Sequence, residues 1–234
     1  TGTALAASLA PRMVRAGRGS VEVIQALRPS MDTEHAALGQ VMARLHLATA
    51  DSGLQRRSER GLEWMSSEAQ RLLARSEPGS RQLLQSMLPV LERLRRQRPA
   101  LPEALLHGDL FRDNVLFDGH HLSGLIDFYN ACSGPMLYDV AIAVNDWCSH
   151  PNGEIDEERS RPLLAAYSAL RRFTPAEAEL WQPMLRMACV RFWLSRLIAA
   201  QNVVGQQVQV KDPDEFYRLL RARQHFHSAL PFAF

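Results

Sequence analysis

Cysteine is scarce in this chain, and the few cysteines are widely spaced. Cys132, Cys148 and Cys189 are odd in number and form no CxxC pair. A disulfide framework or a structural zinc site requires paired or closely spaced cysteines. The sequence therefore argues against both kinds of site, and it favours a reducing, cytoplasmic setting.

Long apolar runs and a strong charge of one sign are also missing. The apolar stretches are interrupted by Arg, Asp or Gln within a dozen residues, so no segment is expected to span a bilayer. The first residues lack the charged and apolar regions of a signal peptide. A formal net charge of +2 provides no electrostatic footprint for nucleic acid. These absences argue against a membrane or a nucleic acid as partner, and they say nothing about oligomeric state.

Helical patterns dominate the 234 residues, 46% of which are hydrophobic, so a sizeable core is expected. A first helix is predicted after a cap at Asp32 or Thr33, with an apolar face that includes Leu38, Met42, Leu45 and Leu47. Further helices are predicted at 61–75, 79–97, 136–149, 157–171, 175–202 and 212–228. The second of these should bend or restart near Pro89. Two later helices carry start signals, with cap, proline and glutamate at Thr174, Pro175 and Glu177, and with cap and proline at Asp212 and Pro213.

Short strands are predicted in two places. Residues 11–27 contain two apolar runs around a glycine-containing loop, which suggests a hairpin. Residues 101–130 contain three more runs, at 105–106, 115–117 and 122–128, and Asp118-Gly119 is a hairpin turn signal between the last two. The candidate chemistry lies in this second cluster.

Three polar residues of this cluster have the types and spacing that phosphoryl transfer requires. The reaction needs a nucleophile aligned with the γ-phosphate and metal to neutralise its charge, and Mg²⁺ takes hard oxygen ligands with only one or two carboxylates. Asp109 can accept the proton of an alcohol. Asn114, five residues later, and Asp127, across the hairpin, can bind metal from two sides. Each residue alone could be an ordinary turn or cap residue, so the interpretation depends on the joint pattern.

The joint pattern resembles two signatures of the protein kinases. His107, Asp109 and Asn114 follow the spacing of the kinase catalytic loop, and Asp127-Phe128 at the end of a hairpin is similar to the metal-binding loop. The resemblance implies a protein-kinase-like α+β fold, with Asp109 as the catalytic residue, Asn114 and Asp127 as metal ligands, and ATP and Mg²⁺ as cofactors.

Two departures from the protein-kinase signatures indicate which group of kinases the sequence resembles. Gly108 replaces the arginine with which a regulated protein kinase holds its phosphorylated loop, and Tyr129 stands where the metal loop has its final glycine. This form looks like the aminoglycoside phosphotransferase and choline kinase superfamily, which acts on small alcohols. Several blocks are similar to the homoserine kinases of that superfamily, from about Asp32 to the last helix; they lie at 60–64, 111–117, 124–129, 138–142, 145–148 and 191–197. The resemblance implies ATP-dependent phosphorylation of L-homoserine, as in threonine biosynthesis.

Other residues are expected to support the site. His107 is predicted to hold the loop by hydrogen bonding, and His46 is predicted to be a core histidine. Asp139 opens an apolar helix, where an acid is favoured by the helix dipole; the resemblance implies a buried acid that fixes the catalytic loop through backbone N–H groups. Asp113 either pairs locally or takes a direct role.

The acceptor site has two candidate arginines. The carboxylate of homoserine needs a cation, and Arg191 and Arg196 are the candidates, because arginine grips a carboxylate bidentately. An ordinary surface salt bridge is the alternative for each. Another small alcohol, such as choline or an aminoglycoside, remains an alternative acceptor, and these cations would ask for aromatic or acidic surroundings.

The sequence has no candidate for part of a kinase nucleotide site. It contains no G-x-G-x-x-G and no Walker motif, and Lys211 is its only lysine, about a hundred residues after the catalytic loop. We interpret residues 1–28 as the remnant of an N-terminal β-lobe with its hinge, and residues 29–234 as a mainly helical C-terminal lobe. The chain alone is expected to be inactive. A truncated kinase is the simplest reading, and a degenerate kinase or non-catalytic binding module is the alternative.

Overall fold

The computed structural model describes residues 34–202, 211–226 and 229–231. The hairpin predicted at 11–27, the proposed lobe remnant 1–28 and the caps Asp32 and Thr33 lie outside the described residues.

Seven described α-helices and four short strands build the structure. The helices are α2 (Glu34–Ala50), α3 (Leu62–Leu73), α4 (Pro78–Gln97), α5 (Met136–Trp147), α6 (Glu157–Leu170), α7 (Pro175–Asn202) and α8 (Pro213–His225). The strands are β1 (Glu103–Leu106), β2 (Val115–Asp118), β3 (His121–Leu125) and β4 (Cys132–Pro135). Three 3₁₀ turns lie between them: η1 (Arg98–Ala100), η2 (Arg112–Asn114) and η3 (Phe128–Asn130).

The strands form two separate antiparallel pairs. The predicted hairpin of β2 and β3 is confirmed, with Asp118 opposite His121 next to the turn. Strand β4 was not predicted; it pairs with β1 so that Leu106 lies opposite Cys132. This pairing brings the chain that follows β1 next to the chain that precedes β4, although the two are more than 20 residues apart in sequence.

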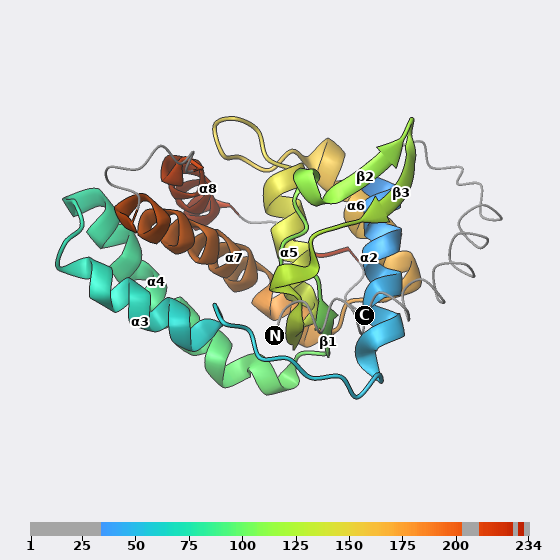
Figure 1. Ribbon diagram of the computed structural model, residues 1–234, viewed down its shortest axis with the longest axis horizontal. Coiled ribbons are helices and arrows are strands. Elements are labelled where there is room, and N and C mark those ends of the chain that lie inside the picture. Colours follow the sequence, from blue (N-terminus) through green and yellow to red (C-terminus); the bar gives the residue numbers. More distant parts are fainter. Residues whose placement is uncertain (1–33, 203–210, 227–228, 232–234) are drawn as a thin grey trace.

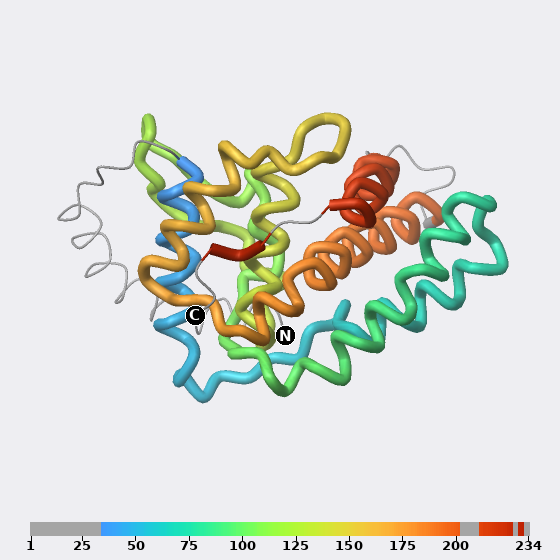
Figure 2. Tube along the Cα trace, turned by 180° about the vertical axis from the view of Figure 1, so that it is seen from behind, coloured from blue at the N-terminus to red at the C-terminus, as the bar shows by residue number. Residues whose placement is uncertain are grey.

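Helix α5 lies at the centre of the arrangement (Figure 1). On one side of it α2 packs against α6, beside the β2–β3 hairpin. On the other side α7 packs against α8, α5 and α4, and α3 pairs with α4; the same two groups are seen from behind in Figure 2. Of the twelve residues of α5, all but Asp146 are buried. A helix that is apolar on nearly every face belongs inside a protein, and this one forms the core against which the site is built.

The predicted start signals of the last two helices are confirmed. The Thr174 hydroxyl accepts a hydrogen bond from the Glu177 N–H at 3.2 Å, and the Glu177 carboxylate accepts one from the Thr174 N–H at 2.8 Å. These two bonds form a complete capping box. The Asp212 carboxylate accepts a hydrogen bond from the Asp214 N–H at the start of α8.

The prediction for Leu47 was wrong, and one of the two alternatives predicted at Pro89, a restart of the helix, is excluded. Leu47 is 50% exposed, because the buried side of α2 passes through Met42, His46 and Thr49, and Leu47 points off it. Helix α4 continues through Pro89 instead of restarting there. Pro89 is exposed, so water can satisfy the carbonyl group that loses its helical partner. No described helix combines the length and the apolar content of a membrane span.

Candidate active site

Asp109 lies in the loop that follows β1, with its two carboxylate oxygens in different surroundings. Oδ2 accepts a hydrogen bond from the Asn130 amide at 3.0 Å. Oδ1 is buried and has no hydrogen-bond partner among the described residues. Burial raises the pKa of Asp109; the charges of Arg191 and His107 oppose that shift, and the charge of Asp127 adds to it. A buried acceptor without a partner is unusual, and here it is the atom that a substrate hydroxyl could use.

Asn114 ends the turn η2 and is buried beside Asp109. Its amide nitrogen donates to the backbone carbonyl of Asp109 at 2.7 Å, and its own backbone carbonyl accepts from the N–H of Ile126 at 3.0 Å. The first bond fixes the amide with the nitrogen toward the loop. It leaves the amide oxygen, the atom that binds hard cations, available.

Asp127 follows β3 and has a left-handed backbone conformation, with φ of 62° and ψ of 62°. Few residues other than glycine adopt this conformation, and aspartate is among those that tolerate it. Its side chain is exposed, and no described residue forms a hydrogen bond or ion pair with its carboxylate. The N–H of the preceding residue, Ile126, donates to the carbonyl of Asn114, so Asp127 follows directly after a contact with the catalytic loop.

His107 supports the residues that flank Asp127. Its Nε2–H donates to the carbonyl of Ile126 at 2.8 Å, and its ring contacts Phe128 with 4.5 Å between centroids. The side chain is fully buried. The structure therefore places His107 between the catalytic loop and the hairpin, in a position suited to support.

Asp139 holds the start of the catalytic loop from α5. Its carboxylate accepts the N–H groups of His107 and Gly108 at 2.7 and 2.8 Å, and it lies 3.2 Å from Nε2 of His46. Burial acts to raise the pKa of Asp139. The hydrogen bond from His46, the charges of the two histidines and the Gly108 N–H outweigh burial, so the pKa lies below its ordinary value.

The backbone conformation and the close packing at position 108 explain why this residue is a glycine. Its φ is +76°, and a Cβ there would lie 2.6 Å from the backbone oxygen of Asn130. Only glycine fits both a left-handed conformation and such a close backbone approach. The catalytic loop and the segment that contains Asn130 therefore lie directly against each other.

Arg191 reaches this site from α7, whereas Arg196 contacts a different element. The Arg191 guanidinium donates to the Asn130 side-chain oxygen at 3.0 Å and lies over the Phe192 ring at 3.9 Å. It is only 5% exposed and forms no ion pair with a described carboxylate. Burial lowers the pKa of Arg191, while Tyr138 and Asp109 oppose the shift, and a guanidinium keeps its proton at neutral pH.

The contacts of Arg196 are with the start of α8. Its guanidinium donates to the backbone carbonyl of Asp212 at 2.7 Å and to Glu215 at 2.6 Å. In the catalytic loop, Asp113 pairs with Lys211 at 2.8 Å, and both side chains are well exposed. These two ion pairs tie α8 and the residues before it to α7 and to the loop.

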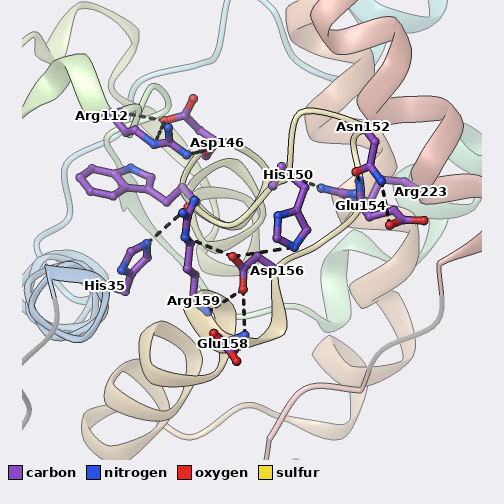
Figure 3. A network of polar contacts seen from close by, with 12 residues as sticks. His35, Arg112, Asp146, His150, Asn152, Glu154, Asp156, Glu158, Arg159 and Arg223 are labelled. Carbon is purple, nitrogen blue, oxygen red and sulfur yellow. Dashed lines mark hydrogen bonds and ion pairs between the residues drawn. The ribbon is translucent and has the colours of Figure 1, made fainter.

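The middle of the catalytic loop is attached to the end of α5. The backbone N–H of Arg112 donates to the Asp146 carboxylate at 2.9 Å, and the Arg112 guanidinium donates to the Asp146 carbonyl at 2.6 Å. Figure 3 shows these two side chains side by side. The indole N–H of Trp147 donates to the carbonyl of Leu110 at 3.2 Å.

Asn130 is the residue of this site that sequence reasoning missed. It is the third residue after Asp127, and its amide contacts both Asp109 and Arg191. A polar side chain so close to the metal-loop pattern was the available signal. The contact itself depends on the unpredicted β1–β4 pairing.

The donor set fits a hard divalent cation. Asp127 offers a free carboxylate and Asn114 offers an amide oxygen. The described residues contain no group of three His, Cys, Asp or Glu side chains that could enclose a metal on their own. Mg²⁺ binds in just this sparse way, with few carboxylates and with phosphate oxygens completing its shell.

A mainly helical lobe with an Asp–Asn loop and a hairpin ending in Asp has the arrangement of a kinase catalytic lobe. Residues 24–181 match the model of the phosphotransferase enzyme family, and the chain belongs to that family.

Sequence relatives show which members of this family the chain is similar to. A homoserine kinase of Pseudomonas aeruginosa is 56% identical over 196 residues, which cover 84% of this chain and 62% of the relative. A homoserine kinase of Methylobacillus flagellatus is 41% identical over 187 residues, which cover 80% of this chain and 58% of the relative. The chain thus spans about three-fifths of the length of these relatives.

Solved structures agree on the fold. A choline/ethanolamine kinase family protein from Mesorhizobium loti superposes with a TM-score of 0.58 at 20% identity, over 87% of this chain and 64% of that one. An ethanolamine kinase of Plasmodium vivax gives a TM-score of 0.54 at 17% identity, over 81% and 58%. The α+β, protein-kinase-like fold expected from the sequence is confirmed.

Proposed function

We propose that the natural protein containing this chain transfers a phosphoryl group from ATP to L-homoserine, with Mg²⁺ as the metal. The observation that carries the proposal is the unpaired buried Oδ1 of Asp109. The loop of Asp109 is bonded to Asn114, and Asn114 is bonded to Ile126, the residue before Asp127. The identity with homoserine kinases supports the choice of acceptor.

Each site residue has a role that follows from its surroundings. Asp109 would align the acceptor hydroxyl and take its proton at Oδ1, since Oδ2 is held by Asn130. Asn114 and Asp127 would hold the metal. Mg²⁺, when bound, neutralises charge on the phosphate oxygens. His107 and Asp139 would keep the two loops in place through the hydrogen bonds already described.

This chain provides part of the surface that would contact the nucleotide. Leu116 and Ile126 are 45% and 42% exposed and lie close in sequence to Asn114 and Asp127. They offer an apolar surface next to the metal ligands, which suits a nucleobase. Lys211 is engaged with Asp113 at the surface, so it is no candidate for the phosphate-binding lysine of a kinase.

The surroundings of Arg191 favour an acceptor that carries a carboxylate. Its guanidinium is buried without an ion-pair partner among the described acids, and it is linked to Asp109 through Asn130. A buried cation gains most from an anionic ligand with matching geometry. Choline or an aminoglycoside would place a second cation in the site, and this arginine would repel it. Arg196, which pairs with Glu215, stays the weaker candidate for this role.

The test is an acceptor panel on the natural protein with ATP and Mg²⁺. ADP release would be measured with L-homoserine, 3-aminopropan-1-ol, choline and an aminoglycoside, and ³¹P NMR would identify the product. We expect turnover with L-homoserine to exceed the others and to give a phosphomonoester. A preference for choline or the aminoglycoside would contradict the proposed acceptor, and no turnover with any alcohol would contradict the reaction.

A further inference from the structure

Asn130 links the base of the site to its buried cation. Its amide nitrogen donates to Oδ2 of Asp109 at 3.0 Å, and its side-chain oxygen accepts from Arg191 at 3.0 Å. Arginine can only donate and an ionised carboxylate can only accept. The two neighbours therefore determine which way the amide faces, with its oxygen toward Arg191 and its nitrogen toward Asp109.

The backbone holds Asn130 in this position from both sides. Strands β1 and β4 pair up to Leu106 and Cys132, so the residues just beyond this pair lie side by side. The backbone oxygen of Asn130 lies so close to Gly108 that no larger residue fits there. The N–H of Ala131 donates to the carbonyl of Phe128 and closes the η3 turn. The amide is thus held on a fixed segment and not on a free loop.

A neutral amide between the two charges has a chemical consequence. A direct ion pair between Arg191 and Asp109 would occupy both groups with each other. With Asn130 between them, only Oδ2 of Asp109 and one Arg191 nitrogen are used, and they bond to the amide. Oδ1 of Asp109 stays free for a hydroxyl proton, and the other N–H groups of Arg191 stay free for an anion.

We propose that Asn130 is a positioning residue that orients the base Asp109 and couples it to recognition of the acceptor carboxylate at Arg191. The inference rests on the proposed function, because it assumes an acceptor that carries both a hydroxyl and a carboxylate. When such an acceptor binds Arg191, the amide turns that contact into a fixed orientation of Asp109. An alcohol that lacks the carboxylate forms no contact at Arg191, so it gains only the direct effect of Asn130 on Asp109.

Two substitutions in the natural protein separate the two bonds. Asn130→Ala removes both, whereas Asn130→Asp, which has the same shape, keeps an acceptor for Arg191 and loses the donor to Asp109. Asn152→Ala is the matched control, because Asn152 is an exposed asparagine whose amide donates to Glu154, outside the site. The measurements are kcat and KM with L-homoserine and with 3-aminopropan-1-ol, the same molecule without its carboxylate, together with ATP affinity by calorimetry and thermal unfolding.

We expect kcat with L-homoserine to fall about 10- to 100-fold in both Asn130 variants, because small displacements of a base have effects of this size. ATP affinity should be unchanged. The preference for L-homoserine over 3-aminopropan-1-ol should shrink in both variants. Asn130→Ala removes the link to Arg191, and in Asn130→Asp the new carboxylate pairs with Arg191 and competes with the acceptor carboxylate. Asn152→Ala should leave all values near those of the wild type.

Several outcomes would overturn the inference. If Asn130→Asp folds and keeps the wild-type kcat, the amide does not position Asp109. If Asn130→Ala keeps the full preference for L-homoserine, there is no coupling to Arg191; should that variant fail to fold, the kcat of Asn130→Asp decides alone. A wild-type protein that favours an alcohol without a carboxylate would overturn the proposed function and this coupling together. A wild-type protein that uses L-homoserine while the variants match the control would overturn this inference alone.

Discussion

Three carboxylates in and beside the catalytic loop differ sharply in their surroundings. Asp139 is buried and bonded to two backbone N–H groups and His46, and its pKa is lowered in spite of burial. Asp109 keeps one oxygen unpaired, and burial raises its pKa. Asp127 is exposed and has no described partner. Such differences between neighbouring acids support the separate roles that we propose for them, as support, base and metal ligand.

The stability of the protein should depend on pH through Asp139. Because its folded pKa lies below its unfolded value, its stabilising contribution is present at neutral pH and is lost as pH falls below about 4. Asp139→Asn should lower the free energy of unfolding at pH 7 by about 3 kcal/mol or more, since a buried network loses its charge. The difference from the wild type should shrink between pH 5 and pH 3, roughly the window of the unfolded pKa.

Urea denaturation at several pH values measures this effect. Asp118→Asn is the control, because Asp118 is exposed at the hairpin turn. A difference between Asp139→Asn and the wild type that stays constant down to pH 3 would show that the charge of Asp139 is not the stabilising feature.

Substitutions at two glycines can distinguish backbone strain from steric crowding at the catalytic loop. Gly108 and Gly119 both have left-handed φ values, +76° and +58°, but a Cβ at Gly119 has nothing within 4 Å, whereas one at Gly108 meets Asn130. Gly119→Ala should lower stability by about 1–2 kcal/mol for the conformation alone. Gly108→Ala should lower it further and should reduce kcat strongly, because it moves Asp109. Equal effects of the two substitutions on both quantities would contradict the close approach.

At the scale of elements, α5 holds most of the catalytic loop. Asp139 binds the first residues, Trp147 binds Leu110 and Asp146 binds Arg112, so one buried helix contacts the loop at three points. A helix that is buried on nearly every side cannot shift without disturbing the core. The position of Asp109 is therefore tied to the packing of the whole molecule.

Trp147→Phe tests this attachment. The substitution removes the indole N–H that donates to Leu110 and keeps an aromatic ring. Trp193→Phe is a matched control, since Trp193 is equally buried and lies on α7. Both variants should lose stability through lost packing, with about 1 kcal/mol more at Trp147 for the hydrogen bond. Only Trp147→Phe should reduce kcat in the natural protein. An equal reduction of kcat in Trp193→Phe would show that the hydrogen bond from Trp147 to Leu110 does not specifically position the loop.

The sequence predicted most elements because their signals are local. Apolar periodicity and caps such as Thr174 and Asp212 lie within one helix, and the β2–β3 turn lies within one hairpin. Strand β4 could not be predicted in this way. Its residues, Cys132-Ser133-Gly134-Pro135, contain two turn formers, and what makes them a strand is pairing with β1, about thirty residues away.

The same distinction applies to the site. The spacing of His107, Asp109 and Asn114 is visible within a single loop. The structure adds that His107 and Asn114 both bond to Ile126, the residue before Asp127. The contact of Asn130 with Arg191 joins residues 61 positions apart, and the pairing of Arg196 with Glu215 depends on how α7 packs against α8. Contacts of this kind follow from tertiary packing and have no local sequence pattern.

The whole molecule assembles the site from three separate parts of the chain. Asp109 comes from the loop after β1, Asp127 from the end of the hairpin and Arg191 from α7. Residues far apart in the chain thus converge on one region. What this chain does not contain is a lysine suited to the nucleotide, because Lys211 is its only one and pairs with Asp113.

Residues 1–234 alone should therefore show little or no kinase activity. Phosphoryl transfer depends on positioning and on neutralising phosphate charge, and this chain offers groups for only one side of the nucleotide. Calorimetry should detect weak ATP binding at most, and homoserine-dependent ADP release should be far below that of the natural protein. Turnover in the usual kinase range of about 1–100 s⁻¹ would show that these residues suffice.

The most direct test of the site is to compare Asp109→Asn and Asp127→Ala in the natural protein. Asp113→Asn is the control, since Asp113 lies in the same loop but is exposed and pairs with Lys211. We predict that Asp127→Ala abolishes Mg²⁺-dependent turnover, that Asp109→Asn lowers kcat by about 100-fold or more with unchanged ATP affinity, and that Asp113→Asn stays near the wild type. Wild-type kcat in Asp109→Asn, or equal losses in all three variants, would contradict the roles given to Asp109 and Asp127.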